Sequence, residues 1–204
     1  MNARSTGRAP ATPNTMPDPL LDPLPTAATT WPFWVIVVTV TGLDFITKIL
    51  AVEYLAPRHV PHRVIGEFVR FTLAYNPGAA FGMHLGPASR WIFGVLSLVI
   101  VTVLLRSTAE LTRLSRLAAV GVPIVIGGAL GNLLDRIRQR EGVVDFIDIG
   151  VGDTRFWTFN VADTAVTIGA VCLILALWHQ ERLQAARVAA SDARRGPAEH
   201  PASS

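Results

Sequence analysis

Four long stretches of apolar residues, separated by polar segments, dominate the sequence. They occupy residues 31–51, 88–105, 117–134 and 161–178, and each approaches the roughly 20 residues that a helix needs to cross the apolar core of a bilayer. Backbone groups inside a bilayer must be hydrogen-bonded within the protein, so each stretch is predicted to be a helix. The pattern predicts an all-α polytopic membrane protein, with one four-helix domain over residues 31–180 and both termini on the same side.

The connections carry a second, shorter period. Val69, Phe71, Leu73 and Tyr75 alternate with polar or small residues, which is typical of a strand with one apolar face. Residues 155–159 are also strand-like, whereas residues 142–146 are interpreted as a loop. We therefore expect a small β-sheet on the membrane surface.

The two ends of the chain lack an apolar period. Residues 1–30 contain six prolines among Ala, Thr, Ser and Asp, so this segment is predicted to be a disordered tail. The first apolar stretch is longer than the core of a cleaved signal peptide and is read as a retained span. Residues 181–204 are predicted to be a second disordered, polar tail. Residues 106–116, read as a short basic connection, favour cytoplasmic termini.

Composition supports a membrane protein and excludes some other classes. The chain has 204 residues, of which 50% are hydrophobic and only 16% charged, too apolar for an ordinary soluble domain. The net charge is +3, but the 18 basic residues are spread along the chain, so no nucleic-acid surface is predicted. The single cysteine, Cys172, excludes an internal disulfide and paired-thiol chemistry.

Polar residues in and beside the predicted helices converge on one membrane face. In a four-helix alternating topology, the end of an odd-numbered span and the start of an even-numbered span share a face. Eight polar residues occupy such positions: Asp44, Lys48, Asn76, Asn132, Asp135, Asp145, Asn160 and Asp163. Because a charge at the centre of a membrane helix costs about 2.5 to 3.5 kcal/mol on insertion scales, such a cluster indicates a functional site.

Two pairs stand out in this cluster. Asp44 and Lys48 are spaced i, i+4 and share one helix face; they are either a structural ion pair or groups that contact a substrate, and both interpretations remain open. Asp145 and Asp163 are the candidates for chemistry. Two carboxyls held close share a proton, so one can activate water while the other protonates a carbonyl or leaving amine. The alternative makes Asp163 a helix N-terminal anion and Asp145 a loop carboxylate.

Other chemistries fit the sequence less well. The histidines do not lie beside a candidate serine nucleophile, and no His-Glu-x-x-His run is present to bind zinc. We therefore predict neither a serine nucleophile nor a metal site. A proton-coupled membrane transporter is the main alternative, because transporters also keep carboxylates in their spans. A structural membrane scaffold, in which both aspartates would tolerate replacement, is a further alternative.

Four ordered sequence blocks resemble those of the bacterial lipoprotein signal peptidases, also called signal peptidase II. The blocks are residues 44–48 (DFITK), 76–81 (NPGAAF), 127–136 (GGALGNLLDR) continuing to 142–146 (GVVDF), and 159–163 (FNVAD). The resemblance covers residues 33 to 180, and the two terminal tails lie outside it.

The resemblance implies an inner-membrane aspartyl endopeptidase without a cofactor. Such an enzyme removes the signal peptide of a diacylglyceryl-modified prolipoprotein on the amino side of the lipidated cysteine, so the implied partners are that substrate and membrane lipid. We expect a monomer with cytoplasmic termini and an active site near the extracytoplasmic face, and the resemblance implies that the small sheet is an extracytoplasmic β-sheet (cradle) for the substrate. The resemblance implies that Asp145 and Asp163 are catalytic. The residues implied to shape the site or contact substrate are Asp44, Lys48, Asn76, Gly78, Asn132, Asp135, Arg136, Asn160 and Ala162.

Overall fold

Four long helices form the body of the protein in this computed structural model, which describes residues 30–80, 83–84 and 86–195. They are α1 (Trp31–Tyr54), α2 (Ser89–Leu114), α3 (Arg116–Arg138) and α4 (Val161–Arg195). Within those residues, these four helices are long and apolar enough to cross a membrane. The predicted class, a four-span membrane protein with a small sheet, is confirmed.

The helices extend beyond the predicted spans. The basic segment read as a connection, residues 106–116, instead forms the end of α2, and only Ser115 separates α2 from α3. The structure also differs from the predicted C-terminal tail, because α4 continues to Arg195. Alanine, glutamine, arginine and leucine in residues 181–195 are strong helix formers, and no glycine or proline interrupts them. The tails predicted over residues 1–29 and 196–204 lie outside the described residues.

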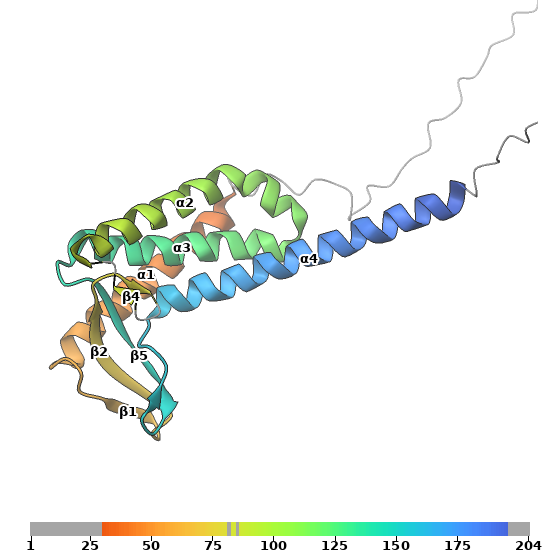
Figure 1. Cartoon of the computed structure of the whole chain (residues 1–204). Helices are drawn as coiled ribbons and strands as arrows, with labels where there is room; N and C mark the ends of the chain where they lie inside the picture. The colour runs from red at the N-terminus through yellow and green to blue at the C-terminus, as the bar shows by residue number, and fades with distance from the viewer. Residues whose placement is uncertain (1–29, 81–82, 85, 196–204) are drawn as a thin grey trace, which may run out of the picture.

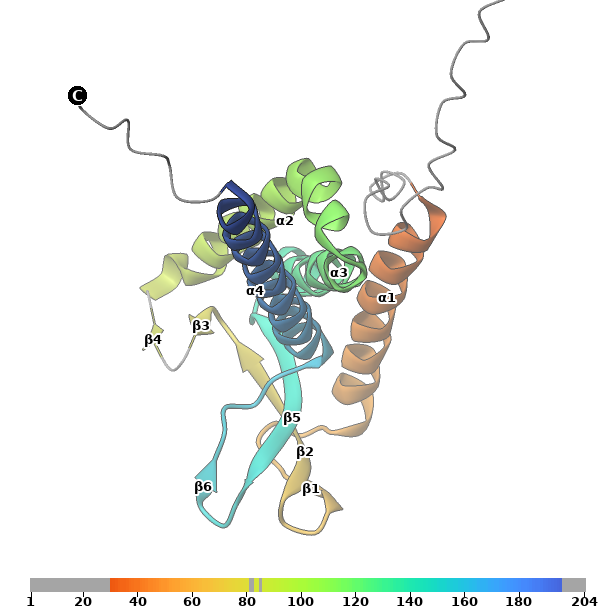
Figure 2. The same cartoon turned by 90° about the vertical axis from the view of Figure 1, so that its right-hand side faces the viewer.

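A small antiparallel sheet lies at one end of the helices (Figures 1 and 2). Its order is β1 (His62–Ile65), β2 (Val69–Asn76), β5 (Val143–Val151) and β6 (Thr154–Arg155). Two short strands, β3 (Ala79–Ala80) and β4 (Met83–His84), pair separately, and the short helix η2 (Gly86–Ala88) leads into α2. The predicted strand at residues 69–75 is confirmed as β2.

The segment between α3 and α4 differs from its prediction. Residues 142–146 do not form a loop, because Asp145 lies within β5, opposite Ala74 of β2. Val143 and Val144 are almost fully buried, at 2% and 1% exposure, so the strand packs on both of its faces. Strands buried on both faces lack the alternation that marks a half-buried strand, and the acidic residues further mask the pattern.

Helix α3 lies at the centre of the bundle, packed against α1, α2 and α4 (Figure 2). About 61% of its span is buried, against 17–22% for the spans of the other helices. Glycines permit the close packing: a Cβ at Gly127 would meet Val40 of α1 at 2.8 Å, and one at Gly128 would meet the carbonyl oxygen of Ala162 at 2.5 Å. Small residues therefore let α3 approach α1 and α4 closely.

Candidate active site

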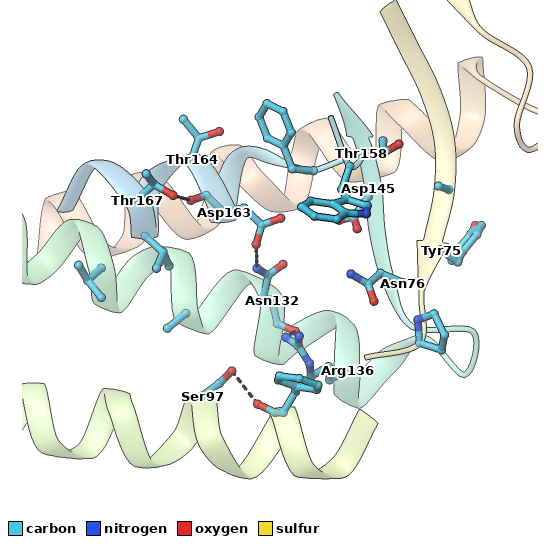
Figure 3. A pocket seen from close by; sticks show the side chains of 18 of the residues that line it. Tyr75, Asn76, Ser97, Asn132, Arg136, Asp145, Thr158, Asp163, Thr164 and Thr167 are labelled. Carbon is cyan, nitrogen blue, oxygen red and sulfur yellow. Dashed lines mark hydrogen bonds between the residues drawn. The ribbon is translucent and has the colours of Figure 1, made fainter. Parts of the chain in front are cut away.

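A cavity of about 820 Å³ opens between the sheet and helices α2, α3 and α4, a size typical of ligand sites. Asp145 of β5 and Asp163 in the first turn of α4 both line it (Figure 3). The rest of the cavity continues along the helices between apolar residues such as Phe93, Ile100 and Ile168. One end of the cavity is therefore acidic and the remainder is mostly apolar.

Asp163 is fixed at the start of α4 by a reciprocal cap. Its backbone N–H donates to Oδ1 of Asn160 at 2.9 Å, and the Asn160 N–H donates to Oδ2 of Asp163 at 3.3 Å, the arrangement of a capping box. Asn132 of α3 donates its side-chain amide to Oδ1 of Asp163 at 2.7 Å (Figure 3). Both carboxyl oxygens therefore accept hydrogen bonds, which fix the orientation of this carboxyl group.

Asp145 is held from two sides and is only 3% exposed. The Asn160 side-chain amide donates to its Oδ1 at 2.7 Å, and the Asn76 side chain also hydrogen-bonds it. Burial, followed by the nearby charge of Asp163, raises the pKa of Asp145 from its ordinary value of 3.8 to about 7, although the two asparagines and Lys48 act in the opposite direction. Asp145 can therefore carry a proton near neutral pH.

A buried ion network lies directly behind the two aspartates. Lys48 is 3% exposed, and its Nζ lies 2.8 Å from Asp44, 2.9 Å from Asp135 and 2.9 Å from Oδ1 of Asn132. Asn132 in turn contacts Asp163. The Asp44–Lys48 pair is thus a structural ion pair in this fold, and neither residue lines the cavity.

The same network attaches four elements, α1, α3, α4 and β5, to one another. Asp44 of α1 accepts the Ala162 N–H at 2.8 Å, at the start of α4. Asp135 of α3 accepts the Val144 N–H at 3.1 Å, immediately before Asp145. A Cβ at Gly131 would overlap the Asp44 carboxylate, so glycine is required where this carboxylate meets α3. The carboxylates therefore position both segments that carry the candidate pair.

Two further predicted residues, Gly78 and Arg136, contact residues that line the cavity. Gly78 has a φ of +113° and donates its N–H to Oδ1 of Asn76 at 3.0 Å; a Cβ there would lie 2.7 Å from Ser89. Only glycine accommodates both this backbone conformation and this contact. Arg136 lines the cavity and donates to the carbonyl oxygen of Asn132 at 3.0 Å.

The predicted residues divide into two groups. Those that line the cavity are Asn76, Asn132, Arg136, Asp145 and Asp163. Those that lie behind or beside it are Asp44, Lys48, Gly78, Asp135, Asn160 and Ala162. All eight residues expected to converge on one face belong to these groups.

Sequence reasoning missed the aromatic wall of the cavity. Residues 156–159 line it and run back along β5, where Phe159 pairs with Ile147. Arg155 anchors this segment: its Nε donates to Asp148 Oδ1 at 2.8 Å and its Nη1 to the Glu67 carbonyl oxygen at 2.7 Å. The strand expected at residues 155–159 forms only in part, because β6 ends at Arg155 and Phe159 makes an isolated bridge to Ile147. Nothing in the sequence indicated which way this segment faces.

Metal binding finds no support in the side-chain geometry. In the part of the chain that the structure describes, no group of three or more His, Cys, Asp or Glu side chains is placed to hold a metal ion. The asparagines beside the two aspartates instead donate their amide hydrogens to the carboxylates. That the chain uses no metal or cofactor remains a prediction.

Comparison with known proteins gives consistent matches. Residues 36–179 match the family model described as Signal peptidase (SPase) II. The chain is 39% identical to the lipoprotein signal peptidase of Coxiella burnetii over 148 residues, covering 71% of this chain and 88% of that protein. It is also 39% identical to the Halothermothrix orenii lipoprotein signal peptidase over 152 residues, covering 74% and 97%.

Solved structures show the same architecture. One bacterial membrane enzyme, determined by the in meso method at 2.3 Å resolution, superposes with a TM-score of 0.65 at 29% identity and covers 74% of this chain and 89% of its own. A second, at 1.9 Å resolution, gives a TM-score of 0.62 at 31% identity, covering 72% and 92%.

Proposed function

Because this chain belongs to the signal peptidase II family of aspartic peptidases, we propose that it removes the signal peptide from diacylglyceryl-modified prolipoproteins, cleaving on the amino side of the lipidated cysteine. The four apolar helices and the family make it a multi-pass inner-membrane enzyme. The observation that carries the proposal is that Asp145 and Asp163 lie together at one end of an otherwise mostly apolar cavity.

The shape of the cavity suits a substrate that is part peptide and part lipid. The peptide would lie at the acidic end, between Asn76 on one side and the aromatic wall on the other. The acyl chains would extend along the helices past Phe93 and Ile100. Holding the lipid in this way keeps the scissile bond beside the carboxyls and so raises its effective concentration.

Hydrolysis would use the two carboxyls as acid and base. The carboxylate of Asp163, which accepts two hydrogen bonds, takes a proton from water as the water oxygen adds to the carbonyl carbon. Asp145, whose raised pKa favours the protonated form, donates its proton to the carbonyl oxygen. Collapse of this intermediate breaks the C–N bond, the amine nitrogen takes the proton from Asp163, and the hydroxyl proton returns to Asp145.

The remaining site residues would act on the carboxyls or on the substrate. Asn132 and Asn160 orient the two aspartates, and Arg136 lies on the cavity wall where it can bind a substrate carbonyl. Asp44, Lys48 and Asp135 would support these groups without touching the substrate. We also propose that the enzyme acts as a monomer.

Replacing each aspartate separately tests the proposal. Asp145→Asn and Asp163→Asn should each lower cleavage of a diacylglyceryl-modified prolipoprotein in detergent by about 10²-fold or more. Asp153→Asn is the matched control, because Asp153 is exposed in the turn between β5 and β6, and it should cleave normally. Retained cleavage in either active-site variant would exclude the proposed pair. Loss of activity on adding a chelator would indicate a metal mechanism instead.

We propose that the termini are cytoplasmic and that the two aspartates lie near the extracytoplasmic face. Cys172 is the single cysteine of the chain, so a Cys172→Ser background allows placement of one reporter thiol at a time. Asp153→Cys beside the sheet should react with a membrane-impermeant maleimide added outside spheroplasts. Arg187→Cys on the far end of α4 should react only after lysis. The reverse labelling pattern would invert this orientation.

A further inference from the structure

A second cavity, of about 140 Å³, lies behind the ion network, on the side away from the two aspartates. It is bounded by the end of α1 nearest the sheet, by the end of α3 and by the start of β5. Its lining residues are Phe45, Lys48, Ile49, Val52, Glu53, Asp135, Arg138, Gln139 and Val144. The space far exceeds the roughly 10–15 Å³ that one water molecule needs, so it can hold a multi-atom polar group.

The base and the rim of this cavity differ in how their charges are paired. At the base, Lys48 and Asp135 contact each other at 2.9 Å. At the rim, Arg138 and Glu53 are exposed and carry opposite charges, yet within the described residues neither forms an ion pair. The rim therefore presents one cation and one anion that remain available to a ligand.

Arg138 is oriented by an aromatic contact. Its Cζ lies 4.5 Å from the centroid of the Phe45 ring, which places the guanidinium over α1. A guanidinium held in this way can still donate two parallel hydrogen bonds to phosphate oxygens. Gln139 also lines this cavity, and glutamine carries an amide donor.

The surface next to this rim is apolar and belongs to a membrane-spanning helix. Ile46, Ile49 and Leu50 of α1 are 55%, 49% and 48% exposed, and their spacing places them on one helix face. In a bilayer such a face contacts acyl chains. A ligand that fits both the rim and this face has a headgroup with both charge signs and hydrocarbon chains.

We propose that this cavity binds the headgroup of a zwitterionic aminophospholipid. The phosphate contacts Arg138, the primary ammonium contacts Glu53, and the acyl chains lie along Ile46, Ile49 and Leu50. A primary ammonium donates hydrogen bonds to a carboxylate, which a trimethylated choline headgroup does not. Charge complementarity thus favours phosphatidylethanolamine over phosphatidylcholine or a purely anionic lipid.

The site also has a structural consequence for the enzyme. Its base, Lys48 and Asp135, contacts Asn132 and the Val144 N–H, the groups that position the two aspartates. A lipid bound here holds α1 against α3 behind the active site. Because it binds the folded protein only, it raises the unfolding temperature.

Lipid retention and thermal unfolding of the purified full-length protein test this inference. The protein is exchanged into mixed micelles containing phosphatidylethanolamine, phosphatidylcholine or phosphatidylglycerol at equal mole fraction. Phosphatidylethanolamine should be retained in native mass spectra and should raise the Tm most. Loss of one charge-assisted contact in Glu53→Gln or Arg138→Gln should weaken its binding about tenfold. The exposed controls Glu110→Gln and Arg140→Gln should bind it normally.

Each other outcome overturns the assignment. Equal stabilisation by all three lipids would show a non-specific annulus. Stronger binding of phosphatidylglycerol would show an anion site at Arg138 alone. Equal binding of soluble glycerophosphoethanolamine would show that the acyl chains contribute nothing, so the ligand is not a membrane lipid. None of these measurements requires cleavage, and repeating them on Asp145→Asn separates this inference from the proposed function.

Discussion

Asn160 and Asp163 each donate a backbone N–H to a side-chain oxygen of the other, at 3.3 Å from Asn160 and 2.9 Å from Asp163. The same Asn160 donates its side-chain amide to Asp145 at 2.7 Å and contacts Asn132 at 3.1 Å. One fully buried side chain therefore sets the positions of both proposed catalytic carboxyls. Its helix-capping role and its role in the active site reside in different atoms, which makes them separable by mutation.

We predict that Asn160→Ser and Asn160→Ala will differ in stability but agree in activity. Serine keeps a neutral oxygen that can cap the Asp163 N–H, whereas alanine loses it, at a cost of about 0.5–2 kcal/mol of folding free energy. Both variants lose the amide donor to Asp145, so both should lose about 10²-fold in kcat. Thermal unfolding and cleavage assays would check this, and a fully active Asn160→Ser variant would contradict it.

The raised pKa of Asp145 predicts a pH dependence of stability. Its carboxyl has a pKa of about 7 in the folded state, against an ordinary value of 3.8, so between these values the folded chain binds more protons than the unfolded chain. The free energy of unfolding should therefore fall as pH rises from about 4 to about 7, by at most about 4 kcal/mol from this group. Asp145→Asn should flatten this slope, whereas Asp153→Asn should not.

The carboxyl proton of Asp145 should also set the alkaline limit of activity. Cleavage by the proposed mechanism needs one proton on the pair, so kcat/KM should fall above pH 7 as that proton is lost. The apparent pKa belongs to the coupled pair and not to either residue alone. A kcat/KM profile that stays flat from pH 6 to pH 9 would contradict this assignment.

Replacing Lys48 alone should lower the folding free energy more than replacing Lys48 and Asp44 together. Lys48→Met leaves Asp44 and Asp135 without their cation, which should cost about 3–5 kcal/mol of folding free energy. Adding Asp44→Asn to Lys48→Met removes one stranded charge and should recover part of this loss. Denaturant unfolding in mixed micelles measures both variants, and a double variant less stable than the single one would argue against the network.

The Arg155–Asp148 contact predicts a change in substrate affinity. Arg155→Gln should loosen the aromatic wall at residues 156–159 and raise KM several-fold while changing kcat little, because the carboxyls keep their own hydrogen bonds. Arg63→Gln is the control, since Arg63 pairs with Glu67 on the surface with its side chain 73% exposed. Equal losses in kcat and kcat/KM for Arg155→Gln would instead place its effect on the carboxyls.

The sequence by itself determined the membrane class, the number of spans and the face on which the polar residues gather. Hydropathy reports span length directly, and alternation of the helices then fixes which ends meet. The sequence did not show that Asp145 lies in a strand, because a strand buried on both faces shows no alternation of apolar and polar residues. Nor did it show that α4 continues to Arg195, because a polar segment rich in helix formers resembles a disordered tail in composition.

Only the tertiary structure decided which side chains surround the two aspartates. Phe93 and Ile100 line the cavity while Val95 and Leu98 of the same helix lie exposed on the surface, yet all four are apolar and equally compatible with a membrane span. Likewise, Lys48 meets acceptors from α1 and α3 that lie more than 80 residues apart in the chain. Such contacts depend on how each helix is rotated against α3, and close packing at Gly127, Gly128 and Gly131 sets that rotation.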